Sequence, residues 1–228
     1  MNIATLSRIP RPSKEQRIDT IVESARKVFC TRGFEKGSIV DIAKDAGIAE
    51  GTLYRYFDGK RGLLDEVLRR HYLVVFDDIQ QTLPTLEGHG NRLRYLIRRI
   101  LLAISGDRGI CGLITRDVRQ FDDKHPPLAQ ELNRQMAVLM AGEIKAGMKD
   151  GSFRADTSPR IVCDMIGGGL ELIAYSYMRT GKEIDVNNVT DSISRTVLGG
   201  IESSDATAQS MAKLVERLEH AADRLDAK

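Results

Sequence analysis

The stretch from Ser38 to Lys60 constrains this chain more than any other, because it carries the start and stop signals of two short helices joined by a glycine turn. Ser38 and Asp41 have the spacing of a capping box, in which each side chain satisfies a free backbone N–H at a helix start. Gly47 stands where a chain leaving a helix often turns left-handed. We therefore expect one helix from about Ser38 to Gly47 and a second from about Ala49.

The second of these helices has one apolar face and one polar face. Leu53 and Phe57 lie one turn apart and are expected to face inward. The outward positions are then Thr52, Arg55 and Tyr56. Two short helices joined in this way form a helix-turn-helix, whose second helix enters the major groove of DNA and reads base edges. The sequence therefore predicts a DNA-reading unit.

This stretch and its flanks resemble the TetR family of bacterial transcriptional regulators. The resemblance covers roughly residues 13 to 68, and its matches follow in order without a gap: Gly33-Phe34, Asp41-Ile42-Ala43, Ala46-Gly47-Ile48, Gly51-Thr52-Leu53-Tyr54-Arg55-Tyr56-Phe57, Lys60 and Leu63-Leu64. Two positions depart from the family pattern. Ala49 stands where the family usually has a capping serine, and Gly37 stands where it usually has a threonine.

The N-terminal part is slightly basic and the rest is not. Residues 1–70 hold 14 Lys and Arg against 10 Asp and Glu, within a chain whose formal net charge is +2. A modest positive excess around the helix-turn-helix suits contact with phosphates. Ser13 and Gln16 form another capping box, followed by an apolar stripe up to Gly33, where we expect the first helix to end.

The sequence predicts an all-α fold, with no strand pattern. An N-terminal three-helix helix-turn-helix domain spans 13–60, a larger helical ligand-binding and dimerisation domain spans 61–204, and an appended amphipathic helix spans 205–228. In the larger domain we expect a turn cluster from Gly106 to Gly112 and a helix that ends at Gly199-Gly200. The other expected helices cover about 60–83, 91–105, 113–121, 128–150 and 158–180.

Four residues of the reading helix are candidate base contacts. Thr52 can bond a base edge or pack its methyl group on thymine, and Arg55 can make a bidentate contact to guanine. Gly51 has no side chain and lets the backbone approach the duplex. Glu50 has two interpretations: it accepts from a cytosine amino group, or it only complements the dipole of the helix.

The resemblance adds four further DNA-binding positions. Tyr54 and Lys60 match positions that hold phosphates, Ser38 matches a contact to the DNA backbone, and Val40 matches one in the groove. Tyr54 has packing as its alternative role.

The resemblance also implies a homodimer in which residues 158–180 and 187–202 pack against their symmetry mates. Gly168, Leu172, Ile193 and Val197 are the interface candidates. Three glycines, 167 to 169, lie inside a predicted helix, where each costs about 1 kcal/mol unless a close neighbour compensates. A dimer places two reading helices about 34 Å apart and so predicts a near-palindromic DNA operator.

An effector pocket is expected among the helices between Asn91 and Thr180. Its candidate residues, which also suit an ordinary core, are Tyr95, Phe121, Met136, Met140, Met165 and Tyr175. The stretch 151–171 is similar to family members that sense fatty acyl-CoA. We therefore expect a ligand-responsive repressor, released by a small apolar effector. The alternative is a constitutive DNA-binding protein whose C-terminal domain only dimerises or docks a protein partner.

Other classes of function find no support in the sequence. The three cysteines, Cys30, Cys111 and Cys163, are widely spaced, and the four histidines lie on separate segments, so we expect no disulfide framework, metal site or cofactor. No catalytic grouping is present, and the chain is not expected to be an enzyme. Without a signal peptide or an apolar run of membrane length, it is expected to be cytoplasmic. A redox switch at Cys111 or Cys163 remains a third interpretation.

Overall fold

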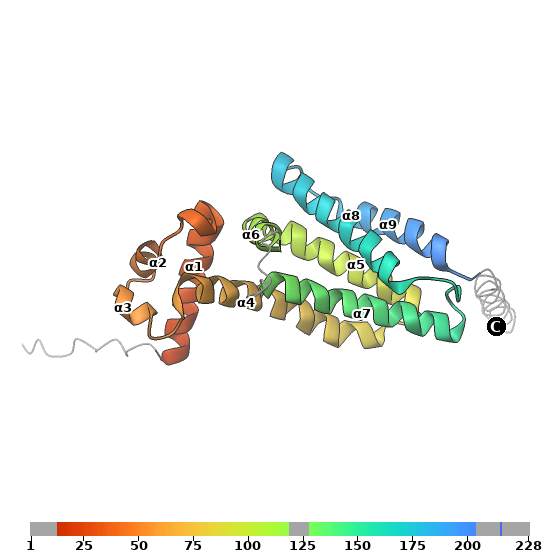
Figure 1. The fold of residues 1–228 in the computed structure, drawn as a ribbon, viewed down its shortest axis with the longest axis horizontal. Helices are drawn as coiled ribbons and strands as arrows, with labels where there is room; N and C mark the ends of the chain where they lie inside the picture. The colour runs from red at the N-terminus through yellow and green to blue at the C-terminus, as the bar shows by residue number, and fades with distance from the viewer. Residues whose placement is uncertain (1–12, 119–127, 204–214, 216–228) are drawn as a thin grey trace, which may run out of the picture. The chain divides into compact units, whose positions relative to one another are not determined.

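The computed structural model describes residues 13–118, 128–203 and 215, and every named element in those ranges is a helix (Figure 1). This confirms the all-α prediction. The described residues form two compact units that divide between His71 and Tyr72, called here the N-terminal and C-terminal units. The elements are α1 (Lys14–Lys36), α2 (Ile39–Asp45), α3 (Glu50–Leu53), α4 (Gly59–Thr82), a 3₁₀ turn (Leu83–Thr85), α5 (His89–Gly106), α6 (Arg108–Val118), α7 (Leu128–Asp150), α8 (Pro159–Thr180) and α9 (Val186–Ile201).

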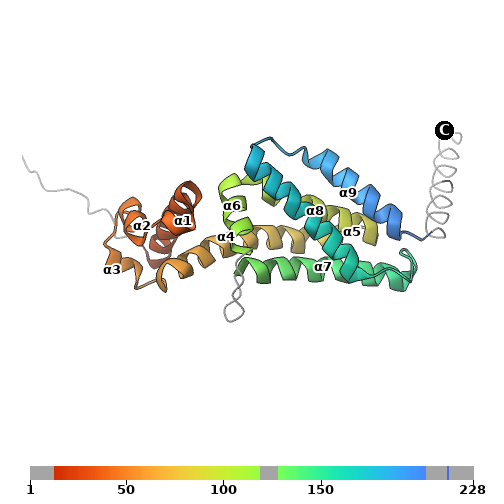
Figure 2. The same ribbon diagram turned by 45° about the horizontal axis from the view of Figure 1, so that its top comes forward.

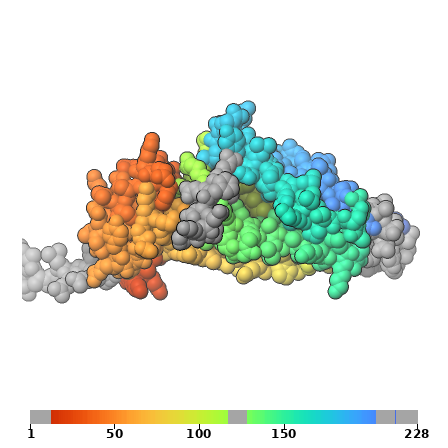
Figure 3. Space-filling model, in the orientation of Figure 1, coloured from red at the N-terminus to blue at the C-terminus, as the bar shows by residue number. Residues whose placement is uncertain are grey.

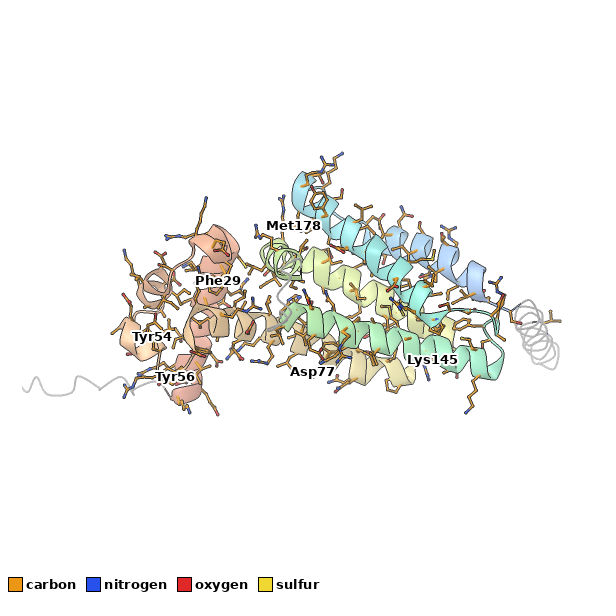
Figure 4. The ribbon with its side chains drawn as sticks, in the orientation of Figure 1. Phe29, Tyr54, Tyr56, Asp77, Lys145 and Met178 are labelled. Atoms are coloured by element: carbon orange, nitrogen blue, oxygen red, sulfur yellow. The ribbon has the colours of Figure 1, made fainter. Side chains whose placement is uncertain are left out.

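The N-terminal unit is built on α1. Both capping boxes form as predicted, at Ser13 with Gln16 and at Ser38 with Asp41. Phe29 of α1 lies in the interior of this unit (Figure 4). Its fully buried partners come from α1, α2, α3 and the first half of α4: Ile21, Ile42, Leu53, Leu63 and Leu68. A core assembled from four helices fixes α2 and α3 on the scaffold of α1.

In the C-terminal unit α5 is the central helix and packs against α6, α7, α8 and α9. Figure 2 shows α8 passing in front of α5. Four fully buried side chains of α5 lie at its centre, namely Leu93, Leu96, Ile97 and Leu101. Buried residues of α7 and α8 complete this core, namely Met136, Met140, Ile144, Ile166 and Leu170.

The link between α7 and α8 is fastened to the end of α9. Arg154 N donates to Ile201 O at 2.8 Å, and Ser203 N donates to Ser152 O at 3.0 Å, around an isolated bridge between Phe153 and Glu202. The ring of Phe153 is buried against Gly147 of α7.

The first helical run of α1 ends at Gly33 as predicted: this residue takes a non-helical φ 77° and ψ 163°, and a short further helical segment continues after it to Lys36. Two other expected helix boundaries were wrong. The expected turn from Gly106 to Gly112 is mostly α6. The side chain of Asp107 caps that helix, accepting from Ile110 N at 3.0 Å.

The second wrong boundary is the end of α9. This helix continues through Gly199-Gly200 to Ile201, and the side chain of Asp185 caps its start. The predicted helix 205–228 lies outside the described residues, apart from helical Val215.

Candidate DNA-binding site

The turn between α2 and α3 has the geometry that the sequence predicts. Gly47 takes φ 67°, and Ile48 N donates back to Ala43 O at 3.0 Å. The reading helix α3 is short, with Ala49 at its N-cap and no side-chain cap bond. The chain then continues in turns closed by Tyr56 N and Phe57 N, which both donate to Leu53 O.

The candidate base contacts lie at the surface of this unit. Glu50, Gly51 and Arg55 are exposed and Thr52 is half-buried, whereas Leu53 is fully buried beneath them. Tyr54 and Val40 are 59% and 55% exposed, so both side chains are accessible to a partner. Figure 4 places Tyr54 beside α3, whereas Tyr56 lies in the turn that follows this helix.

The hydroxyl group of Ser38 makes its hydrogen bonds within the helix cap. Its Oγ donates to Asp41 Oδ2 at 2.7 Å and accepts from Asp41 N at 3.1 Å. The hydrogen bond from Ser38 and the neighbouring Arg32 guanidinium hold the pKa of Asp41 below its usual value. Arg32 Nη1 lies 2.7 Å from Asp41 Oδ1.

Lys60 is also engaged within the protein. Its Nζ donates to Glu35 O at 3.0 Å and lies 4.6 Å from the centre of the Phe34 ring. The side chain is therefore folded back onto the last turn of α1.

Sequence reasoning missed the contacts that join α1 to α2. Arg32 pairs with Asp41, and Lys27 pairs with Asp45. Hydrogen bonds from Lys27 and Ser24 lower the pKa of Asp45. The available signal was the spacing of the two aspartates, one turn apart on α2, opposite basic residues of α1.

The predicted pocket residues separate into two groups. Met136 and Met140 are buried in the core of the C-terminal unit. Tyr95 is half-buried beside that core, and its hydroxyl donates to Asp78 Oδ2 at 2.8 Å. Met165 and Tyr175 are 64% and 45% exposed on the outer face of α8, so they do not line the interior, and we correct their assignment. Phe121 lies outside the described residues.

The predicted interface residues differ in their exposure. Gly168 and Leu172 are exposed on α8, whereas Ile193 and Val197 of α9 are half-buried against the core of their own unit. Figure 3 shows α8 at the surface of this unit. Gly168 and Leu172 belong to an exposed set on this helix with alternating spacings of four and three residues, called here the α8 stripe: Ile161, Met165, Gly168, Leu172 and Tyr175.

Cys111 and Cys163 are buried, and burial raises the pKa of both thiols. A raised pKa disfavours the thiolate that reacts with oxidants. In the described part of the chain, no three His, Cys, Asp or Glu side chains gather to hold a metal ion.

Comparison with known families accounts for both units. Residues 21–67 match the model of the bacterial regulatory proteins of the tetR family, and residues 87–201 match the tetracyclin repressor-like C-terminal domain. The chain belongs to the TetR family. Its similarity to curated relatives extends over most of its length, as expected for a TetR-family chain with both domains.

Two such relatives are transcription factors. The HTH-type transcriptional repressor KstR2 of Rhodococcus jostii is 27% identical over 83% of this chain and 93% of its own length. The HTH-type transcriptional activator FasR of Mycolicibacterium smegmatis is 30% identical over 86% of both chains. The solved structure of FadR from Bacillus subtilis, in complex with stearoyl-CoA, shares the fold with a TM-score of 0.73 at 19% identity, covering 81% of this chain and 99% of that one.

One departure from the TetR pattern has a local steric reason. Gly37 is buried where the chain passes close to α1, and an added Cβ there comes within 3.0–3.1 Å of Val28 Cγ1, Gly33 O and Phe29 Cδ1. A side chain at position 37 therefore fits only if these neighbours shift by a few tenths of an ångström.

Proposed function

We propose that this protein is a transcriptional repressor that binds a near-palindromic operator as a homodimer and is released by a small apolar effector. The observation that carries the proposal is a compact helix-turn-helix unit joined to a second helical unit in one TetR-family chain. The first unit presents exposed groups at α3, and the second supplies a separate apolar core.

The DNA contacts follow the sequence prediction. Thr52 and Arg55 read bases, Gly51 admits the duplex, Glu50 and Val40 lie at the groove, and Tyr54, Ser38 and Lys60 support the phosphate side. The exposure of Gly51 supports this arrangement, since an added Cβ at Gly51 meets no atom within 4 Å and its φ is not positive. Gly51 therefore lies open at the surface of the described N-terminal unit, as a position that admits the duplex must.

The effector is proposed to be an acyl-CoA or another ligand with a long apolar part, bound in the C-terminal unit near Met136, Met140 and Tyr95. Methionine side chains adapt their shape to apolar ligands. The stearoyl-CoA complex of FadR supports this class of effector by fold similarity. Such a ligand acts only if it binds the DNA-competent and released conformations with different affinity.

A second copy of this chain is proposed to cover the α8 stripe. Leu172 and Met165 are 68% and 64% exposed. Added Cβ atoms at Gly167, Gly168 and Gly169 meet nothing within 4 Å, so among the described residues no close packing offsets the roughly 3 kcal/mol that three helical glycines cost. Close approach of a symmetry-related α8 supplies that compensation.

We place the protein in the cytoplasm, where it has access to DNA. Of the described helices, α8 alone is long and apolar enough to cross a membrane, a test that core helices of soluble proteins also pass. One such helix is weak evidence for a membrane protein. We propose instead that its exposed face packs against another protein chain.

The decisive test is selection of bound sequences from a random duplex library, followed by release with stearoyl-CoA and with fractions of a cell extract. The proposal expects a palindromic motif that is released by an acyl-CoA or by one apolar fraction. A motif that no fraction disturbs favours the constitutive alternative. Transcription from a promoter carrying the motif then distinguishes a repressor from an activator such as FasR.

A further inference from the structure

His89, the first residue of α5, lies between two carboxylates of α7. Its Nδ1 lies 2.7 Å from Glu143 Oε2, and its Nε2 lies 3.3 Å from Asp150 Oδ2. The side chains of His89 and Glu143 are largely buried, with 17% and 15% exposure. Both contacts are favourable only when both ring nitrogens carry a proton, because an ionised carboxylate only accepts hydrogen bonds and a neutral imidazole has one N–H. The arrangement therefore matches the imidazolium form of His89.

Asp150 is held in this position by the turn that follows α7. Its Oδ1 accepts hydrogen bonds from Ser152 N at 2.9 Å and from Ser152 Oγ at 2.6 Å, so that its Oδ2 faces the imidazole. These two hydrogen bonds are the main reason that the pKa of Asp150 lies below its usual value, and the nearby His89 lowers it further. An ionised Asp150 therefore stays beside Nε2 when His89 loses its proton.

These contacts join three parts of the C-terminal unit. His89 belongs to the first turn of α5, and the two carboxylates belong to the last two turns of α7. Ser152 O accepts from Ser203 N at 3.0 Å, which joins the same turn to the chain that follows α9. The group is called here the His89 cluster, and its members are His89, Glu143, Asp150 and Ser152.

Other charged groups lie beside this cluster. Arg92 of α5 brings its guanidinium Nη1 to 3.6 Å from Glu143 Oε2. At the end of α9 the Glu202 carboxylate lies close to Gly90, where a Cβ would be 3.6 Å from Glu202 Oε1. The positive end of the α5 dipole disfavours a cation at the first helical position. The two contacting carboxylates of α7 outweigh this effect, since the attraction between charges at contact distance exceeds it in a half-buried site.

We propose that the His89 cluster is a pH-sensitive switch, in which protonated His89 holds the start of α5 against the end of α7. Loss of the proton turns Nε2 into an acceptor that faces the Asp150 carboxylate, and the two groups then repel each other. Histidine changes its charge between about pH 5 and 8, which includes neutral pH. This end of the C-terminal unit is therefore held more tightly at pH 6 than at pH 8. The inference goes beyond the proposed function, because it concerns the free protein.

Amide hydrogen exchange of the free protein tests the switch at the cluster itself. Arg92 N donates to Gly88 O in the first turn of α5, and Ser203 N donates to Ser152 O, so exchange at these amides reports local opening. After correction for the intrinsic effect of pH on exchange, we expect their protection to be about three- to tenfold greater at pH 6, as for one hydrogen bond. Equal protection at pH 6 and pH 8 overturns the proposal.

Asp150→Asn makes the test specific to the proton. The amide oxygen of asparagine still accepts from Ser152, and its NH₂ group donates to the unprotonated nitrogen of a neutral imidazole. In this variant we expect protection of the Arg92 and Ser203 amides to be no greater at pH 6 than at pH 8. His89→Gln, which gains no charge in this range, is also expected to remove the pH dependence. If either variant keeps the pH dependence of the natural protein, the switch is disproved.

Two controls separate the cluster from the rest of the molecule. Asp156→Asn removes a carboxylate at an exposed turn residue outside the cluster and is expected to leave the pH dependence unchanged. The Cys111 amide, which donates to Asp107 O at the start of α6, is the reference within each experiment. A change in Cys111 protection as large as the change at the cluster assigns the pH dependence to the whole unit and overturns the proposal. These measurements use neither DNA nor effector, so their outcome is independent of the proposed function.

Discussion

At the level of single residues, Ala49 is a helix start without its capping side chain. It has the extended conformation of an N-cap, φ −74° and ψ 145°, but makes no side-chain cap bond. We predict that Ala49→Ser raises the free energy of unfolding by about 1 kcal/mol, since a serine oxygen accepts from a free N–H of α3. Urea denaturation followed by circular dichroism measures the change. Ala155→Ser, at an exposed turn residue, is the control and is expected to have no effect.

Asp41 and Asp45 make the N-terminal unit sensitive to acid. The pKa of each carboxyl is lowered in the folded protein from its ordinary value of 3.8, by the Ser38 hydrogen bond at Asp41 and the Lys27 hydrogen bond at Asp45. A lowered folded pKa gives stability that is fully present above pH 3.8 and is lost as the pH falls through the folded pKa. We predict that Asp41→Asn reduces the difference between the urea midpoints at pH 7 and pH 3. An unchanged difference contradicts this assignment.

Sequence reasoning worked for local contacts and failed for contacts between helices. The capping boxes at Ser13 and Ser38 are read from residues three apart, and both form. The bond from Lys60 to Glu35 and the pair between Arg32 and Asp41 depend on how α1, α2 and α4 pack, which spacing alone does not specify. The DNA-contact residues stay predictions, with exposure at Val40 and Tyr54 as support.

At the level of elements, two glycines of α7 lie in opposite surroundings. An added Cβ at Gly147 comes within 2.3 Å of the buried Phe153 ring, whereas one at Gly142 meets nothing within 4 Å. We predict that Gly147→Ala destabilises the protein by about 1–3 kcal/mol, because the ring must move in a packed core. Gly142→Ala is expected to stabilise it by about 0.5–1 kcal/mol through helix propensity. Thermal unfolding of the two variants tests the pair, and equal effects contradict this account.

Glycine also explains where element prediction failed. Gly109 and Gly112 suggested a turn, yet α6 continues through both. Gly112 lies against Met178 at the end of α8, where an added Cβ comes within 2.6 Å of Met178 Cε, and Figure 4 places Met178 beside α6. Here the glycine serves close packing of two helices, and tertiary contact overrides its low helix propensity. A single sequence does not distinguish a glycine that breaks a helix from one that lets another helix approach.

At the level of the whole molecule, the organisation into a reading unit and a second helical unit was predictable because each signal is local. The helix-turn-helix motif, the apolar stripes and the start at Ser158-Pro159 do not depend on the arrangement of distant elements. The assignment of Met165 and Tyr175 to a pocket failed because an apolar stripe does not say whether its neighbour belongs to the same chain or to another. Ile161, also exposed on α8, was not among the interface candidates taken from the sequence, and its place in an interface is part of the proposal.

The prediction for the whole molecule concerns dimerisation through the α8 stripe. Leu172 of this stripe is 68% exposed, so a charged residue there is tolerated by the folded monomer but is buried if a second copy covers the stripe. We predict that Leu172→Glu weakens dimerisation at least about a hundredfold, since an unpaired buried carboxylate costs several kcal/mol. Sedimentation measures assembly, and affinity for the full operator is expected to fall with it. Val138→Glu, at a 57% exposed position of α7, is the matched control and is expected to leave assembly unchanged. A monomeric natural protein, or a Leu172→Glu variant that sediments as the natural dimer does, excludes this face as the interface.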